Sequence, residues 1–182
     1  MASVEPARRA KELGVSLVIT DHHRFGTELP EADAIVHPAL PGTDYPFTGL
    51  CGAGVAFKLA WALCQRRCGS QKVADPLREF LLQAVGLAAI GTVADVVPLL
   101  DENRIIVRNG LKTLYRNPPV GLRKLMELTK VSEKRELASE DIGFTLAPRL
   151  NAAGRLGQAQ LGVELLVTED EPRAEALANY IQ

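Results

Sequence analysis

The sequence is poor in aromatic residues and has no excess of charge of either sign. Aromatic side chains make up 5% of the 182 residues, too few for a platform that stacks the bases of a single nucleic-acid strand. The 21 lysines and arginines are balanced by 22 aspartates and glutamates, which gives a net charge of -1. No overall charge therefore attracts nucleic acid, and any site for a polyanion must be a local patch.

Cysteine is also scarce, and its spacing excludes a zinc ribbon. The three cysteines are odd in number, and Cys64 and Cys68 lie four apart in a helical pattern. We expect reduced core thiols in a cytoplasmic protein. The N-terminus has no apolar signal core. The most apolar segment, residues 84–100, is too short and too interrupted by glycine and polar residues to span a membrane, so no membrane association is expected.

The composition is that of a folded domain, with 47% hydrophobic and 24% charged residues. Residues 15–19 form an apolar, β-branched run without alternation, which predicts a strand buried on both faces, as in a parallel sheet. A second short strand is expected at residues 33–36. After residue 50 strand signals almost disappear, and we expect helices at 3–13, 54–67, 76–94, 103–115, 121–128, 140–150, 162–166 and 173–181.

This pattern predicts an incomplete sheet. Two strands of the parallel type do not form a stable sheet by themselves. The first helix also has the character of a crossover whose preceding strand is missing. We therefore expect an α/β fold in which the chain is the C-terminal part of a larger parallel-sheet domain and is predominantly helical after residue 50.

The first polar feature is Asp21-His22-His23, which directly follows the first predicted strand. In open α/β sheets, ligands bind at the carboxyl ends of the strands. A carboxylate and two imidazoles at that edge can bind a divalent metal or transfer protons. The alternative is a surface turn in which Asp21 caps the next segment. His37, at the end of the second strand, could reach the same edge but is interpreted as structural.

The second polar feature is Asp95, the one charged residue in the apolar run 84–100. We interpret this run as a buried helix with small residues that permit close packing. A carboxylate there is costly unless it is paired, hydrogen-bonded or bound to a metal. Asp95 is therefore a candidate ligand, and the alternative is a structural acid bonded to backbone amides.

The third feature is the segment 147–157, in which Arg149 and Arg155 flank Asn151 and several small residues. Arginine side chains match phosphate oxygens in geometry. The alternative is a helix end with two solvated arginines.

Two other features receive structural interpretations. Residues 102–104 are a helix start with surface charges, and Trp61 is a core residue.

In combination these segments resemble the DHH phosphoesterase superfamily. The resemblance begins with the strand, Asp21-His22-His23 and the residues that follow to Pro38. The continuation is similar to one branch, the RecJ single-strand-specific 5′→3′ exonucleases, in four motifs: Leu50-Cys51-Gly52-Ala53-Gly54-Val55-Ala56-Phe57-Lys58-Leu59, Gly91-Thr92-Val93-Ala94-Asp95-Val96-Val97-Pro98-Leu99, Glu102-Asn103-Arg104 and Pro148-Arg149-Leu150-Asn151-Ala152-Ala153-Gly154-Arg155. Their common order makes an accidental match implausible.

The resemblance implies a hydrolase that cleaves phosphodiester bonds of single-stranded DNA in repair and recombination, using two Mn2+ or Mg2+ ions. By this resemblance His22 and Asp95 are metal ligands, and His23 faces the scissile phosphate. Asp21 orients the loop or stands near the metals. The resemblance also places three residues near the DNA path: Arg149, Asn151 and Arg155.

The sequence departs from the family pattern in two places. It has no Asp-x-Asp cluster of the kind found in the family's first motif, and it lacks the later DHHA1 domain. We therefore expect residues 1–171 to be a partial DHH domain, and residues 172–182 to be the truncated start of the linking helix. The parent protein is then an exonuclease, whereas the isolated chain is inactive. Its partners would be single-stranded DNA and, as candidates, a helicase or a single-strand-binding protein.

Two alternatives remain open at this point. The first is another DHH phosphoesterase, acting on oligonucleotides, cyclic dinucleotides or pyrophosphate. The second is a non-catalytic binding or scaffolding module that keeps the fold without the metals.

Overall fold

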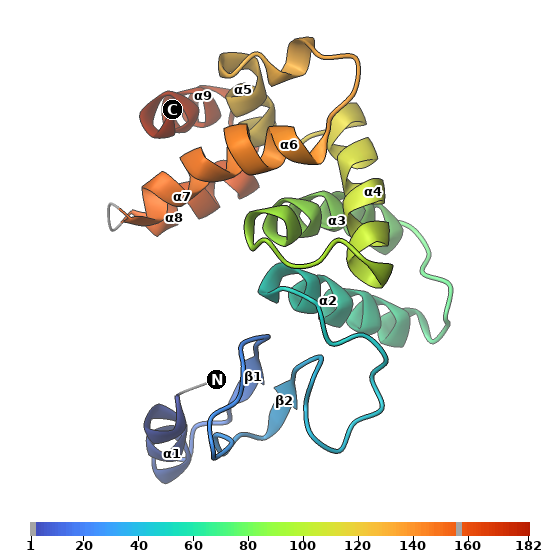
Figure 1. The fold of residues 1–182 in the computed structure, drawn as a ribbon, viewed down its shortest axis with the longest axis vertical. Helices are drawn as coiled ribbons and strands as arrows, with labels where there is room; N and C mark the ends of the chain where they lie inside the picture. Colours follow the sequence, from blue (N-terminus) through green and yellow to red (C-terminus); the bar gives the residue numbers. More distant parts are fainter. Residues whose placement is uncertain (1–2, 156–157) are drawn as a thin grey trace.

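The computed structural model describes residues 3–155 and 158–182, without the side chain of Arg155. The first elements are α1 (Val4–Glu12), β1 (Val18–Thr20) and β2 (Ala34–Val36). The elements after residue 50 in the described part are all helical (Figure 1), which confirms the expected α/β fold with a predominantly helical remainder. They are α2 (Gly52–Cys68), α3 (Leu77–Ala94), α4 (Asp101–Arg116), α5 (Val120–Leu128), η1 (Val131–Glu133), α6 (Ser139–Asp141), η2 (Ile142–Leu146), α7 (Ala147–Arg155), α8 (Ala159–Val167) and α9 (Glu171–Ile181).

β1 and β2 form a two-stranded parallel sheet. The register pairs Val18 with Ala34 and Thr20 with Val36. The prediction that the first strand is buried on both faces is wrong, because Val18 is 60% exposed. A central strand of a parallel sheet is buried when strands flank it and helices cover it. In the described part of the chain β1 has β2 as its one strand neighbour.

α3 is the central helix of the molecule and packs between α2 and α4 (Figure 1). Its contact with α4 is close because both helices present glycines at the crossing. A Cβ on Gly110 would lie 2.3 Å from the Cβ of Ala89. By length and composition α3 could also cross a membrane. Six of its 18 residues are buried, among them Val85, Ala89 and Ile90, which pack against its neighbours.

The sequence predicts that the apolar run 84–100 is one buried helix, and this prediction is wrong. α3 ends at Ala94, and Val96 then adopts a left-handed backbone conformation with φ 58°. This turns the chain out of the core, so Val96 is 87% exposed and Leu100 is 60% exposed. Trp61 is likewise not a core residue, because 41% of it is exposed on α2.

Two hydrophobic clusters hold the helices together. The first joins Leu50, Val55, Val85 and Ile106, from the segment before α2 and from α2, α3 and α4. The second lies among α4 to α9 and the end of α3; its largest fully buried members are Leu114, Leu122, Leu125, Ile142, Leu146 and Leu165. α9 packs on α5 and buries its own apolar face there. A linking role for residues 172–182 stays a prediction.

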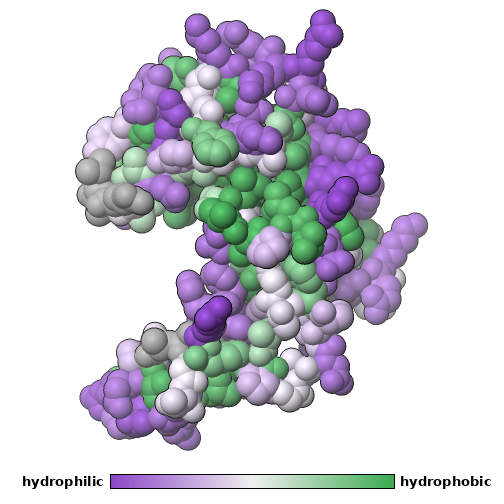
Figure 2. Space-filling view, viewed as in Figure 1, coloured by the Kyte–Doolittle hydropathy of each residue, from purple (hydrophilic) through white to green (hydrophobic). Residues whose placement is uncertain are grey.

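The molecule curves around a hollow. Figure 2 shows it as an open notch on the left of the view, with α1, β1 and β2 below it and α7 and α8 above it. Hydrophobic side chains gather at the back of the notch, over α3 and the segment that follows it. We call this notch the hollow. It lies between the loop that follows β1 and the helices that carry the arginine–asparagine motif.

Candidate functional site

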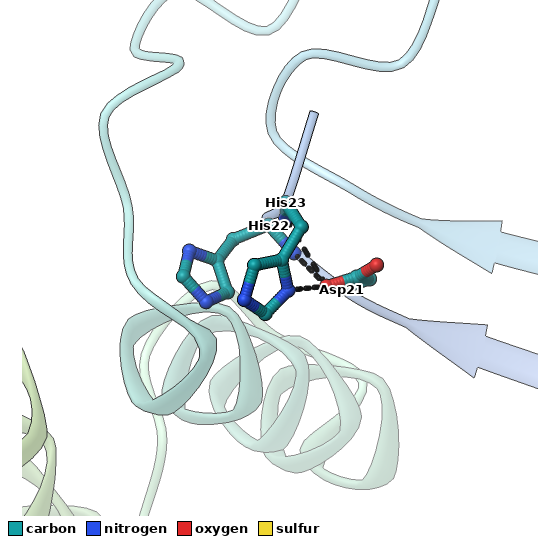
Figure 3. Close-up of side chains that lie close together, drawn as sticks. All are labelled: Asp21, His22 and His23. Atoms are coloured by element: carbon teal, nitrogen blue, oxygen red, sulfur yellow. Dashed lines mark hydrogen bonds and ion pairs between the residues drawn. The ribbon is translucent and has the colours of Figure 1, made fainter. Parts of the chain in front are cut away.

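The loop after β1 is organised by one carboxylate oxygen. Asp21 Oδ1 accepts hydrogen bonds from the backbone amide of His22 at 2.7 Å and from that of His23 at 3.1 Å. It also lies 2.7 Å from His23 Nδ1, so that this nitrogen donates to it (Figure 3). The loop therefore turns around Asp21, and the rings of His22 and His23 project to the same side with their centroids 4.2 Å apart.

These contacts shift the ionisation of Asp21. Burial alone would raise the pKa of this carboxyl group. The hydrogen bonds from His23 and His22, together with the attraction to the His23 ring, outweigh that effect and hold the pKa well below its usual range. Asp21 is therefore a carboxylate at neutral pH.

His22 lies over the N-terminal end of α2. A Cβ on Gly52 would be 3.3 Å from Cδ2 of the His22 ring, so the absence of a side chain at residue 52 makes room for the ring. Cys51 fixes this end of the helix, because its Sγ accepts the amide of Gly54 at 3.3 Å and contacts Thr92 Oγ1 at 3.4 Å. The glycine-rich start of α2 thus packs against the ring of His22.

Asp95 lies beside His22, with its Oδ2 3.6 Å from His22 Nδ1. The expectation of a buried acid is wrong: Asp95 follows the last residue of α3, and its side chain is 41% exposed. α3 ends at Ala94, the residue before Asp95, so the carboxylate of Asp95 projects from the end of the helix. Two candidate ligands that are far apart in sequence are therefore neighbours at the edge of the hollow.

His37 is a second support of the loop. Its side chain is buried, and its Nδ1 accepts the amide of Ala39 at 3.0 Å. Nε2 therefore carries the proton and donates to the carbonyl of His23 at 2.9 Å. Phe25 packs against the ring, with centroids 4.3 Å apart. The structural interpretation of His37 thus agrees with its contacts, and its task is to hold the backbone of His23.

The donor atoms fit a divalent cation. One ligand atom from each of Asp21, His22 and His23 lies within 4.8 Å of the others, and Asp95 adds a carboxylate next to His22. Mn2+ and Mg2+ prefer oxygen ligands, with some imidazole, whereas soft metals prefer thiolates. The residues present could therefore hold such an ion between His22 and Asp95.

Arg149 and Asn151 lie on α7, across the hollow from the histidine loop (Figure 1). Arg149 is partly buried, and its Nη1 donates to the carbonyl of Thr145 at 2.7 Å. Its Nε is buried and has no partner in the described part of the chain. Asn151 is exposed. The side chain of Arg155 lies outside the described residues.

Sequence reasoning missed the role of Asn103, which lies in the segment interpreted as a helix start. Asn103 is fully buried, and its Nδ2 donates to the carbonyls of Gly49 at 2.7 Å and Pro98 at 3.0 Å. It thereby joins the segment before α2 to the segment after Asp95. An asparagine where the helical pattern of α4 calls for an apolar residue is the signal that could have revealed this role.

Known proteins of one family are similar to this chain. Residues 1–92 match the DHH family, N-terminal domain. The chain is 49% identical over 181 residues to the single-stranded-DNA-specific exonuclease RecJ of Bacillus subtilis, covering 100% of this chain and 21% of that protein. The crystal structure of RecJ in complex with Mn2+ from Thermus thermophilus matches with a TM-score of 0.80 and 39% identity, covering 98% of this chain and 26% of that one.

A further crystal structure of the Thermus thermophilus RecJ, in complex with Mg2+, matches with a TM-score of 0.72 and 39% identity. It covers 92% of this chain and 23% of that one. The chain therefore spans about a fifth to a quarter of the length of these relatives. The family match covers half of the chain, and the histidine loop lies inside it. The chain therefore belongs to the DHH family.

Proposed function

We propose that the chain forms part of the metal centre of a RecJ-type exonuclease, which hydrolyses phosphodiester bonds of single-stranded DNA from the 5′ end. One observation carries the proposal: His22 and Asp95 meet at 3.6 Å beside the loop that Asp21 organises, at the edge of the hollow. This chain is similar over its own whole length to a RecJ that is 49% identical, and this similarity supports the choice of substrate.

In this proposal His22 and Asp95 hold the cation, and Asp21 orients the loop. The chemistry that bound Mn2+ or Mg2+ supplies is the activation of a water molecule and the neutralisation of charge on the phosphate oxygens. His23 is 72% exposed on its side chain, and Asp21 fixes its ring through Nδ1. With Nδ1 donating to Asp21, Nε2 accepts a hydrogen bond in the neutral ring, and it would donate one to a phosphate oxygen of a strand lying in the hollow only in the protonated ring.

The opposite wall of the hollow would guide the DNA. We assign Arg149, Asn151 and Arg155 to this task, because they belong to one motif on α7, across the hollow from the histidine loop, and Asn151 is exposed there. A role in repair and recombination, a cytoplasmic location, and a helicase or single-strand-binding protein as partner belong to the same proposal. The names of the relatives support the substrate class only.

The isolated chain is proposed to bind the metal weakly and to be inactive. The described residues offer four donors at this site, one each from Asp21, His22, His23 and Asp95, fewer than a site for two cations needs. Neither a different phosphoesterase substrate nor a purely scaffolding role is favoured by a particular contact in the structure.

Metal binding is tested first, by electron paramagnetic resonance of Mn2+ titrated into the chain. We expect weak saturable binding that His22→Ala and Asp95→Asn each reduce by about tenfold or more. The matched control is Asp101→Asn, an exposed acid beyond the same turn, which should leave the affinity unchanged. Equal affinity in all variants would contradict the proposed ligands.

The activity is tested in a hybrid protein. The corresponding segment of the Bacillus subtilis RecJ is replaced by this chain, which aligns with it over its whole length. We expect Mn2+-dependent degradation of 5′-labelled single-stranded DNA that His22→Ala abolishes. A folded hybrid without activity would sink the exonuclease assignment, while the Mn2+ titration of the chain would still report on the ligands.

A further inference from the structure

The exposed face of α4 carries a row of unpaired cations. Four of its residues, each four positions after the last, are basic and exposed: Arg104, Arg108, Lys112 and Arg116. Residues four apart form one ridge of a helix, and this ridge extends over about 18 Å. None of the four forms an ion pair with another residue that the structure describes. We call this row the α4 ridge.

The α4 ridge lies away from the candidate metal site. The buried residues of α4, among them Ile106 and Leu114, pack into the core beside α3, so the exposed face of α4 points outward. α4 forms the flank of the molecule opposite the hollow (Figure 1), and hydrophilic side chains cover this flank (Figure 2). The α4 ridge and the hollow are therefore separate surfaces.

The spacing of the cations is unfavourable for the chain by itself. Like charges four residues apart destabilise a helix, whereas opposite charges at this spacing stabilise it. α5 uses the favourable pattern, because Arg123 pairs with Glu127 there. Among the residues three or four positions from a member of the α4 ridge, Asp101 is the one acid, and it forms no ion pair in the described part of the chain. A bound polyanion would relieve this repulsion.

The chemistry of the α4 ridge suits phosphate groups. The chain as a whole has a net charge of -1, so a polyanion can be attracted only by a local patch such as this one. Three of its four cations are arginines, whose guanidinium groups match phosphate oxygens in geometry. Successive members are about 6 Å apart along the helix. This step is comparable with that between successive phosphates of an extended nucleic-acid strand.

The surroundings of the α4 ridge favour a nucleic-acid strand over an acidic peptide. A docked peptide depends on apolar anchors that enter a pocket. The apolar groove between α2 and α4 is lined by other residues of α4, such as Ile105 and Asn109, and by none of the four cations. Tyr115, which follows Lys112 by three residues, is 48% exposed on the same side of α4. Its ring can stack on a base of a single strand.

We propose that the α4 ridge is a second contact surface for single-stranded DNA, which binds the phosphates of the strand outside the hollow. The four cations would each neutralise one phosphate, and Tyr115 would stack on a base. The choice of DNA among polyanions rests on the proposed exonuclease function, whereas the α4 ridge itself uses none of the candidate metal ligands. Binding here would retain the strand while its end lies beside His22 and Asp95.

Binding is measured by the fluorescence anisotropy of a labelled oligothymidylate of about twenty nucleotides, titrated with the chain. EDTA is present throughout, so that the metal centre contributes nothing. We expect weak binding that salt reduces further. A plot of the logarithm of the association constant against the logarithm of the salt concentration should have a slope of about -3 or steeper, as four neutralised phosphates of a single strand require.

A double variant tests the cations. Arg108→Ala with Lys112→Ala should make the slope shallower by about 1.4 and reduce the affinity at low salt by about tenfold or more. Stability should not fall, because both side chains are exposed and alanine is the best helix former. The matched control is Arg9→Ala with Lys11→Ala, which removes two exposed cations from α1, far from α4 (Figure 1). It should leave the slope and the affinity unchanged.

A second variant tests the stacking contact. Tyr115→Leu should reduce the affinity for the oligothymidylate by about fivefold or more and leave the salt slope unchanged. Tyr180→Leu is the matched control, because Tyr180 is 55% exposed on α9, another element. It should bind the strand as the unaltered chain does.

Four results would overturn the proposal. The first is an equal effect of the α4 and α1 double variants, and the second is unchanged affinity in Tyr115→Leu. The third is tighter binding of a duplex of the same length, which would assign the α4 ridge to double-stranded DNA. The fourth is displacement of the strand by polyglutamate as readily as by unlabelled oligothymidylate, which would assign it to an acidic peptide. Failure of the proposed metal ligands would leave these measurements untouched, because they are made without metal.

Discussion

At the scale of single residues, two polar side chains hold the candidate site in place. Asp21 gathers the amides of its own loop, and Asn103 joins the segments that lead to His22 and Asp95. Both act through backbone groups, so their effect reaches further than their own contacts. Sequence patterns located Asp21 because it stands in a polar motif after a strand. They missed Asn103, because its hydrogen-bond partners are brought to it only by the tertiary fold.

Replacement of Asn103 is expected to be costly. Asn103→Ala leaves the carbonyls of Gly49 and Pro98 without their donor, and we expect a loss of about 2–3 kcal/mol in the free energy of unfolding. Asn109→Ala is the matched control on the same helix, since Asn109 is exposed and bonds its own helix at the carbonyl of Ile105. That change should stay within about 0.5 kcal/mol. Urea unfolding measures both, and equal losses would contradict the role given to Asn103.

At the scale of elements, most of the helices were predictable because hydrophobic periodicity and helix stops are local signals. The limits of α2, α3 and α5 fall within two residues of their predicted positions. Burial was predicted less well. The exposure of Val18 and of Asp95 depends on what lies beside β1 and on where the chain turns at Val96, and neither is encoded in a short window. The proximity of His22 and Asp95 followed from the family resemblance and not from spacing.

Asp141 anchors the start of the segment that leads into η2. It is 4% exposed, accepts the amide of Ala138 at 2.9 Å and forms an ion pair with Lys134. Burial alone would raise the pKa of Asp141, but these hydrogen bonds lower it. Its contribution to stability is therefore complete above about pH 4, the usual pKa of aspartate, and is lost as the pH falls through the lower folded value.

We therefore expect Asp141→Asn to reduce the free energy of unfolding at pH 7 by about 1–3 kcal/mol. The difference from the unaltered chain should shrink as the pH falls below about 4. Glu140→Gln, an exposed neighbour, is the control and should change little. Urea titrations across this pH range provide the measurement, and a difference that grows toward acid would be inconsistent with the lowered pKa.

The crossing of α3 and α4 gives a second prediction at this scale. Alanine normally stabilises a helix relative to glycine by about 1 kcal/mol. At Gly110 the added Cβ would meet Ala89 at 2.3 Å and the carbonyl of Val85 at 2.6 Å. We expect Gly110→Ala to destabilise the chain by about 2–3 kcal/mol, because the helices must move apart. Gly154→Ala on α7 has open space and should be neutral or stabilising. Thermal unfolding of both variants distinguishes these cases.

At the scale of the whole molecule, stability is unevenly distributed. The helices from α2 onward share two hydrophobic clusters, whereas the first forty residues contribute few buried apolar side chains, such as Ala7. The loop with the candidate ligands belongs to the weakly packed region and contacts the well-packed one at Gly52 and Asp95. Such a region opens at lower free energy than the core does.

Hydrogen exchange followed by mass spectrometry should reveal this gradient. We expect the amides of α1, β1 and β2 to exchange well before those of α3 and α4 in the chain without metal. Mn2+ should slow exchange in the loop after β1, because binding links it to Asp95 at the end of α3. Uniform protection along the chain would show that the first elements are packed as firmly as the rest.

α3 also restricts how the sequence can change in length. Its residues belong to both hydrophobic clusters, and Asp95 follows its last turn. Each residue of an α-helix adds about 100° of rotation. One inserted or deleted residue between Val85 and Ile90 would therefore turn one cluster away from its partners and carry Asp95 out of reach of His22. Among homologous sequences, length variation should be concentrated in surface loops such as residues 39–46 and should spare this helix.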